Sequence, residues 1–180
     1  MENWEFIGLE EDVKAKDRLE AILPCYKDSS GQPRYTVVDR EERYKKPDVV
    51  LRRKNDDGSV TMFKVELEHC MTDINWEKRK NNVFGDVQVP YRKDECLRTA
   101  LEEFPNYFHK YVQFSPDMME FCVSNSSIVL GSRVIRDLPV LGLNKKQYKS
   151  DFFQVLFDHW AWHRVIESNG DISTVSFNLG

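Results

Sequence analysis

The sequence contains no apolar run of about 20 residues, the length that a membrane-spanning helix needs, so no membrane partner is expected. It also lacks a Gly-rich phosphate loop and a dinucleotide-binding fingerprint, which disfavours ATP and NAD enzymes. Its four cysteines include no Cys-x-x-Cys pair, which disfavours a zinc ribbon. The N-terminus is acidic and polar, unlike a secretory signal. These absences predict an intracellular protein with reduced cysteines, located in the cytoplasm, or in the nucleus or a host cell if it is viral.

The composition is that of an ordinary soluble globular protein, with 41% hydrophobic and 31% charged residues. A length of 180 residues predicts a single domain over residues 1–180. The net charge of −4 disfavours nucleic-acid binding over the whole surface. Phosphate binding requires only a local positive groove, however, and residues 34–54 and 133–149 are both rich in Lys and Arg. These stretches are either nucleic-acid contacts or solvated faces.

Hydrophobic periodicity and turn signals predict a mixed central β-sheet flanked by helices, in the α/β (α+β) class. The last predicted helix rests on apolar residues that recur at helical spacing from Tyr148 to Ile166. The helices are expected at residues 9–23, 74–84, 90–104 and 145–168. Strands are expected at residues 35–38, 48–53, 60–68 and 171–179, and strands or extended connections at residues 108–114, 119–123 and 127–130.

Acidic side chains occupy two of these strands, which are joined by a strong hairpin turn, Asn55-Asp56-Asp57-Gly58. Because side chains alternate along a strand, Lys64, Glu66 and Glu68 share one face. If Asp48 lies on the matching face, the hairpin brings three carboxylates together. Such a cluster is costly without a cation, and oxygen ligands suit Mg²⁺ or Mn²⁺. The pattern therefore predicts a metal site that hydrolyses phosphodiester bonds.

The order Pro47-Asp48, hairpin, Glu66-x-Glu68 resembles the core of the PD-(D/E)xK nuclease superfamily. The resemblance implies a metal-dependent endo- or exonuclease that binds DNA or RNA. It also implies that the metal ligands are Asp48, Glu66 and the backbone carbonyl of Leu67. A carboxylate from the first helix often joins such sites, and Glu20 is the candidate here, ahead of residues 10 and 11.

The sequence departs from the superfamily at Glu68, where a lysine is usual. Glu68 is then a second-metal ligand or a general base, and a cation from elsewhere takes the place of the lysine. Lys64 and Arg79 are the preferred catalytic cations, because each would orient a water and stabilise charge on the phosphate. The full set of candidates is Lys64, Lys78, Arg79 and Lys80. Gln88-x-x-Tyr91 is similar to a glutamine and tyrosine that follow the acidic strand in some members.

Two alternatives remain open. The chain is either an active enzyme or a catalytically inactive PD-(D/E)xK-like scaffold that binds protein or nucleic acid, such as a regulatory protein of a virus or mobile element. A homodimer is also compatible with the sequence.

His159 and His163 lie four residues apart and would share one face of the last predicted helix. We expect both to pack beside aromatic residues without a metal. Trp160 or Trp162 with Arg164 would form a stacking surface for unpaired bases.

Overall fold

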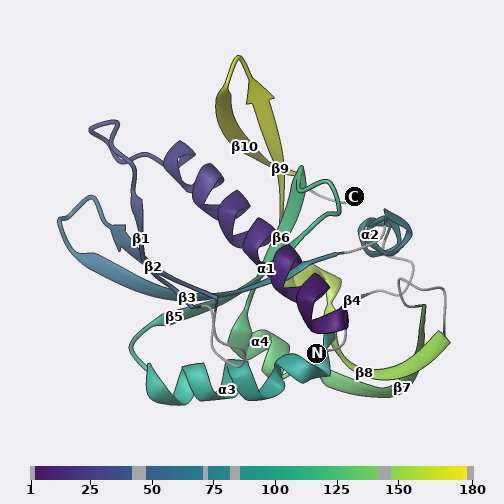
Figure 1. Cartoon of the computed structure of the whole chain (residues 1–180). Helices are drawn as coiled ribbons and strands as arrows, with labels where there is room; N and C mark the ends of the chain where they lie inside the picture. Colours follow the sequence, from purple (N-terminus) through teal and green to yellow (C-terminus); the bar gives the residue numbers. More distant parts are fainter. Residues whose placement is uncertain (1–2, 42–47, 71–72, 82–85, 142–146, 178–180) are drawn as a thin grey trace.

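The computed structural model describes residues 3–41, 48–70, 73–81, 86–141 and 147–177 (Figure 1). Its helices and 3₁₀ turns are α1 (Asn3–Ile22), η1 (Leu23–Cys25), α2 (Asp73–Lys80), η2 (Tyr91–Lys93), α3 (Asp94–Glu103), α4 (Ser126–Leu130) and η3 (Phe157–His159). Its strands are β1 (Tyr35–Arg40), β2 (Val49–Lys54), β3 (Val60–His69), β4 (Asp86–Pro90), β5 (Phe108–Phe114), β6 (Glu120–Asn125), β7 (Arg133–Leu141), β8 (Gln147–Leu156), β9 (Ala161–Ser168) and β10 (Asp171–Phe177).

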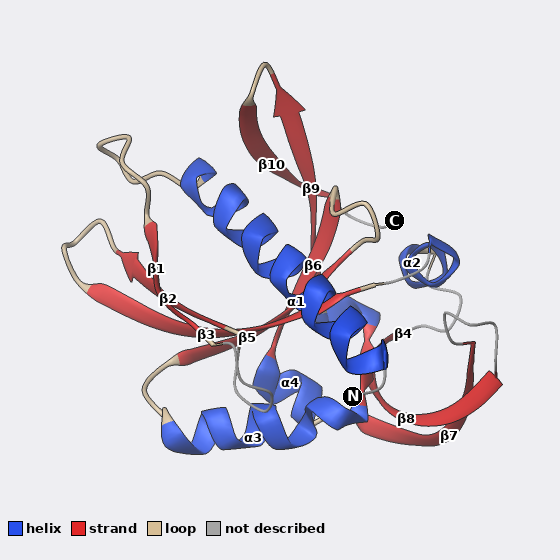
Figure 2. Ribbon diagram, viewed as in Figure 1, coloured by secondary structure: helices blue, strands red, loops and turns tan. Residues whose placement is uncertain are grey.

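Seven strands form one mixed sheet in the order β1-β2-β3-β5-β6-β9-β10. The β3–β5 pair is parallel and the other pairs of this sheet are antiparallel. A second, three-stranded sheet has the order β4-β8-β7. Figure 2 shows α1 crossing the large sheet, with α3 and α4 below it. This mixed sheet with flanking helices confirms the predicted fold class. None of the described helices is long and apolar enough to span a membrane.

The predicted hairpin between β2 and β3 is confirmed, and it sets the position of the acids. Gly58 has a φ of +84°, a conformation that glycine adopts without steric cost, and its N–H donates to the carbonyl of Asn55 at 3.0 Å. The register pairs Val49 with Val65. The next pair along the ladder would join Asp48 and Glu66, so the two acids lie on neighbouring chain segments.

The two faces of the large sheet pack against two different hydrophobic cores. Val65 and Leu67 of β3 belong to an apolar core that α1 covers, because alternate side chains point to opposite faces. That core includes Ala15, Leu19, Ile22, Val112 and Phe114. Glu66 and Glu68 therefore point to the other face. A second core includes Trp76, Val87, Leu97, Tyr111, Cys122, Phe153 and Trp162.

The predicted helix over residues 145–168 is wrong. Residues 147–156 and 161–168 are the strands β8 and β9, with η3 between them, while residues 145 and 146 lie outside the described residues. Phe153 and Val155 are buried while Leu156 is 59% exposed, which is the two-residue period of a strand. Asn169 and Gly170, with φ values of +51° and +81°, form a two-residue β9–β10 hairpin turn of the Asn-Gly kind.

Three smaller differences concern one short helix and two strands of the second sheet. Residues 127–130, expected as a strand or an extended connection, belong to the short helix α4. The strands β4 and β7 had no counterpart in the prediction, and both pair with β8 to build the second sheet. Because a helix was expected where β8 lies, the predicted fold contains no counterpart of the second sheet.

Candidate active site

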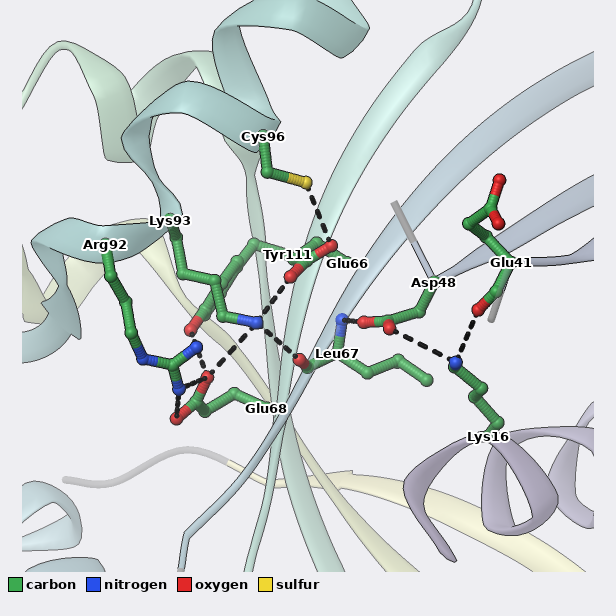
Figure 3. Close-up of polar contacts among 10 residues, drawn as sticks. All are labelled: Lys16, Glu41, Asp48, Glu66, Leu67, Glu68, Arg92, Lys93, Cys96 and Tyr111. Atoms are coloured by element: carbon green, nitrogen blue, oxygen red, sulfur yellow. Dashed lines mark hydrogen bonds and ion pairs between the residues drawn. The ribbon is translucent and has the colours of Figure 1, made fainter. Parts of the chain in front are cut away.

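Asp48 lies directly before β2 and is held by the neighbouring strand β3 and by α1 (Figure 3). Its Oδ2 accepts a hydrogen bond from the backbone N–H of Leu67 at 2.7 Å. Its Oδ1 lies 3.5 Å from the Nζ of Lys16, which also donates to the carbonyl of Glu41 at 2.6 Å. Asp48 and Lys16 are both buried. The carboxylate is thus fixed beside the β3 backbone that separates Glu66 from Glu68.

Lys93 supplies the cation at the centre of the site. It is the last residue of η2, is buried, and lies directly before α3. Its Nζ forms an ion pair with Glu66, donates to the carbonyl of Leu67 at 3.3 Å, and lies 3.5 Å from Glu68 Oε2. Figure 3 shows this ammonium between the three oxygens. The sequence prediction missed Lys93, although it placed the residue within a helix.

The charges around Lys93 compensate one another. Burial disfavours its ammonium, but Glu66 and Glu68 outweigh that penalty and raise the pKa of Lys93 well above its usual value. Burial likewise opposes the charge on Glu68, but Lys93 and Arg92 hold the pKa of that carboxyl below its usual value. Both groups are therefore charged over the physiological pH range.

The negative charge of Asp48 is balanced less completely by its neighbours. Burial, followed by the negative charge of Glu66, raises the pKa of Asp48 to about 7, against the opposing effects of Lys93, the Leu67 N–H and Lys16. An anionic carboxylate is therefore costly here near neutral pH. An additional cation close to Asp48 would remove that cost.

This raised pKa predicts how stability depends on pH. The folded protein retains the Asp48 proton up to about pH 7, whereas the unfolded chain releases it near its usual value of about 4, so stability falls as pH rises through that window. Asp48→Asn removes the dependence. In EDTA, the free energy of unfolding of the variant relative to wild type should rise by about 2 kcal/mol between about pH 5.5 and about pH 8.

Urea unfolding at several pH values measures this difference. Asp171→Asn is the matched control, because Asp171 is an exposed aspartate on β10. Its curve should follow that of the wild type at every pH. Parallel curves for Asp48→Asn and wild type would contradict the raised pKa.

The cations proposed from sequence take other positions. Lys64 Nζ lies 3.6 Å from the ring centroid of Phe104, in a cation–π contact beside α3. Arg79 is close enough to lower the pKa of Glu68, although burial, which acts in the opposite direction, is the largest influence on that carboxyl. The Arg79 Nη1 is buried without a hydrogen-bond partner among the described residues. Lys78 is exposed, and Lys80 pairs with Glu77 and Glu120.

The carboxylates are also distributed differently from the expectation. Glu68 faces Arg92 at 3.2 Å and Lys93, and it accepts a 3.5 Å hydrogen bond from the hydroxyl of Tyr111. Glu20 pairs with Arg40 at 3.1 Å, and the contact from α1 to Asp48 comes from a lysine one turn earlier. In the part of the chain that the structure describes, no three His, Cys, Asp or Glu side chains form a group that could hold a metal ion. The expected convergence of three carboxylates is not found there.

The remaining motifs contribute to packing. His163 stacks on Phe121 with ring centroids 4.8 Å apart, as predicted, but His159 is exposed, so that part of the prediction is wrong. The two histidines lie on η3 and β9, so they share no helical face. The carbonyl of Gln88 accepts a hydrogen bond from Gln113 at 3.3 Å.

Comparison with protein-family models and with curated proteins finds no match for this chain. The chemistry of the site is therefore inferred from its own residues. Two buried acids and one carbonyl offer hard oxygen ligands, and a buried ammonium in contact with Glu66 and that carbonyl offers a fixed positive charge. This combination can bind a cation and an anionic phosphate side by side.

Proposed function

We propose that this protein is a divalent-metal-dependent nuclease that hydrolyses phosphodiester bonds of DNA or RNA. The supporting observation is the contact of Lys93 with Glu66, the Leu67 carbonyl and Glu68. Under this proposal, Lys93 supplies the positive charge that the PD-(D/E)xK pattern usually takes from a lysine at the position of Glu68. Asp48, directly before the adjacent strand β2, completes the acidic pair.

The oxygens of Asp48, Glu66 and Leu67 fit Mg²⁺ or Mn²⁺, which prefer carboxylate and carbonyl ligands. The raised pKa of Asp48, caused by burial and then by Glu66, marks a carboxylate whose charge lacks full compensation, and a bound cation would provide it. Such an ion, when bound, polarises a phosphate oxygen and makes a hydroxide nucleophile available near neutral pH.

The side chains of the protein provide the rest of the chemistry. Lys93 is held charged and fixed by its carboxylate partners, so it can stabilise negative charge that develops on the phosphate without reorganising. Arg92 has a side chain that is 53% exposed, so it can bind a substrate phosphate while its guanidinium contacts Glu68. Glu68 acts as a positioning residue for both cations.

An inactive binding scaffold is the second candidate. Lys93 already contacts Glu66 and the carbonyl of Leu67, and Lys16 contacts Asp48, so each proposed metal ligand faces an ammonium. Internal cations of this kind can neutralise the acids without a metal. The same fold would then bind nucleic acid or protein without cleaving it.

Calorimetric titration with Mn²⁺ and cleavage assays on labelled DNA and RNA separate these candidates. The nuclease proposal expects stoichiometric Mn²⁺ binding, cleavage that stops in EDTA, and loss of at least nine-tenths of both signals in Asp48→Ala. The exposed control Asp171→Ala should retain both. Wild-type protein that neither binds Mn²⁺ nor cleaves nucleic acid would falsify the nuclease proposal and leave the scaffold.

A further inference from the structure

A bulge interrupts β7 on the second sheet. The register with β8 shifts between Ile135 and Leu138, which places Arg136 and Asp137 outside the regular ladder. Asp137 has a φ of +56°, in the left-handed region that residues other than glycine adopt only occasionally. Bulges next to functional sites re-aim side chains, and strain of this kind persists where neighbouring groups enforce it.

One carboxylate on β8 enforces the bulge. Asp151 Oδ1 accepts a 3.0 Å hydrogen bond from the backbone N–H of Asp137, and its Oδ2 accepts one from Arg136 Nη1 at 2.6 Å. The hydrogen bond from the Asp137 backbone, followed by that from Arg136, lowers the pKa of Asp151. The same side chain thus holds both the strained backbone and the guanidinium beside it.

The guanidinium that Asp151 holds lies over the segment that carries the catalytic lysine. Arg136 Cζ is 4.6 Å from the ring centroid of Tyr91, and that ring packs on Phe153 at 5.1 Å. Tyr91 is the first residue of η2, which continues through Arg92 to Lys93. The Arg136 side chain is still 58% exposed, so it presents positive charge to solvent beside Tyr91, two residues before Lys93.

We propose that Arg136 binds a phosphate of the nucleic-acid strand, on the side of the site formed by β7 and η2. The proposal rests on the nuclease or nucleic-acid-binding function and names a substrate contact for it. A guanidinium presents hydrogen-bond donors in a planar fork that matches phosphate oxygens. Because Asp151 and Tyr91 already order Arg136, binding costs it less conformational entropy than it would cost a free surface arginine.

Binding in EDTA tests this contact without cleavage. Fluorescence anisotropy with labelled single-stranded and duplex DNA and RNA gives the dissociation constant and its salt dependence. Arg136→Gln should weaken binding about tenfold and lower the salt slope by about one. Arg133→Gln is the matched control, since it removes the same charge from an exposed position on the same strand, and it should change binding less than twofold.

Asp151→Asn gives a test of opposite sign. If only the overall charge mattered, removing an acid would strengthen binding to a polyanion. We expect weaker binding, because Arg136 loses the carboxylate that holds it. Tighter binding by Asp151→Asn, or equal losses in Arg133→Gln and Arg136→Gln, would overturn the proposal.

The outcomes also separate this contact from the nuclease proposal. Nucleic-acid binding that depends on Arg136, without cleavage in Mn²⁺, would refute the nuclease and retain the contact on a binding scaffold. Cleavage by wild type with unchanged Kd and KM in Arg136→Gln would refute the contact alone. A wild-type protein that binds no nucleic acid would refute both.

Discussion

Under the nuclease proposal, replacing Lys93 by methionine should reduce Mn²⁺-dependent cleavage at least 100-fold. Methionine keeps the length and the apolar stem of the side chain but removes the charge that faces Glu66 and Glu68. Loss of one preorganised group that stabilises transition-state charge typically costs a factor of about 10² to 10³ in turnover. Single-turnover cleavage measures the effect separately from product release.

A second substitution distinguishes lost catalysis from lost structure. Adding Glu68→Lys to Lys93→Met moves the ammonium to the position where the PD-(D/E)xK pattern usually has it. We expect the double variant to recover part of the lost cleavage, and Glu68→Lys alone to impair it, because it places an ammonium beside Lys93 and Arg92. Equal activity of Lys93→Met and wild type would remove Lys93 from the mechanism.

Glu66→Ala should lower the free energy of unfolding by about 3 kcal/mol, because removing one partner of a buried ion pair leaves the other charge uncompensated. The charge left behind is the ammonium of Lys93, which is 7% exposed. The thiol of Cys96, which donates to Glu66 Oε2 at 3.4 Å, also loses its acceptor. Urea unfolding in EDTA measures the loss.

The control is the double variant Glu66→Ala with Lys93→Met. Removing both charges should cost less than the sum of the two single changes, since no buried charge then lacks a partner. Glu103→Ala, at an exposed position on α3, should change stability little. Additive losses in Glu66→Ala and Lys93→Met would show that the two side chains do not stabilise each other.

The parts of the site that depend on local sequence were predictable. Asp48 and Glu66 are joined by one hairpin whose Gly58 specifies its turn, so turn chemistry and strand alternation suffice to bring them together. Lys93 could not be placed in this way. It reaches Glu66 from η2, which packs against β8, and no spacing within the sequence encodes that approach.

The second half of the chain shows a different limit. The aromatic and aliphatic residues from Tyr148 to Ile166 fit a helical period, but the strands β8 and β9 bury alternate residues instead. The local signal against a helix was the Asn169-Gly170 pair, which favours a two-residue hairpin turn. Tertiary pairing with β4 and β6 decided the structure of this segment.

The pairing of β4 with β8 also makes the position of Lys93 depend on the last third of the described residues. Residues Asp86–Pro90 lead directly into η2, and they are hydrogen-bonded to a strand that follows more than 60 residues later. A fragment that ended before β8 would retain Asp48, Glu66 and Lys93, yet β4 would lose its only partner strand among the described residues. The acids are therefore brought together by a local hairpin, whereas the segment that carries their counter-ion is held by a strand distant in the sequence.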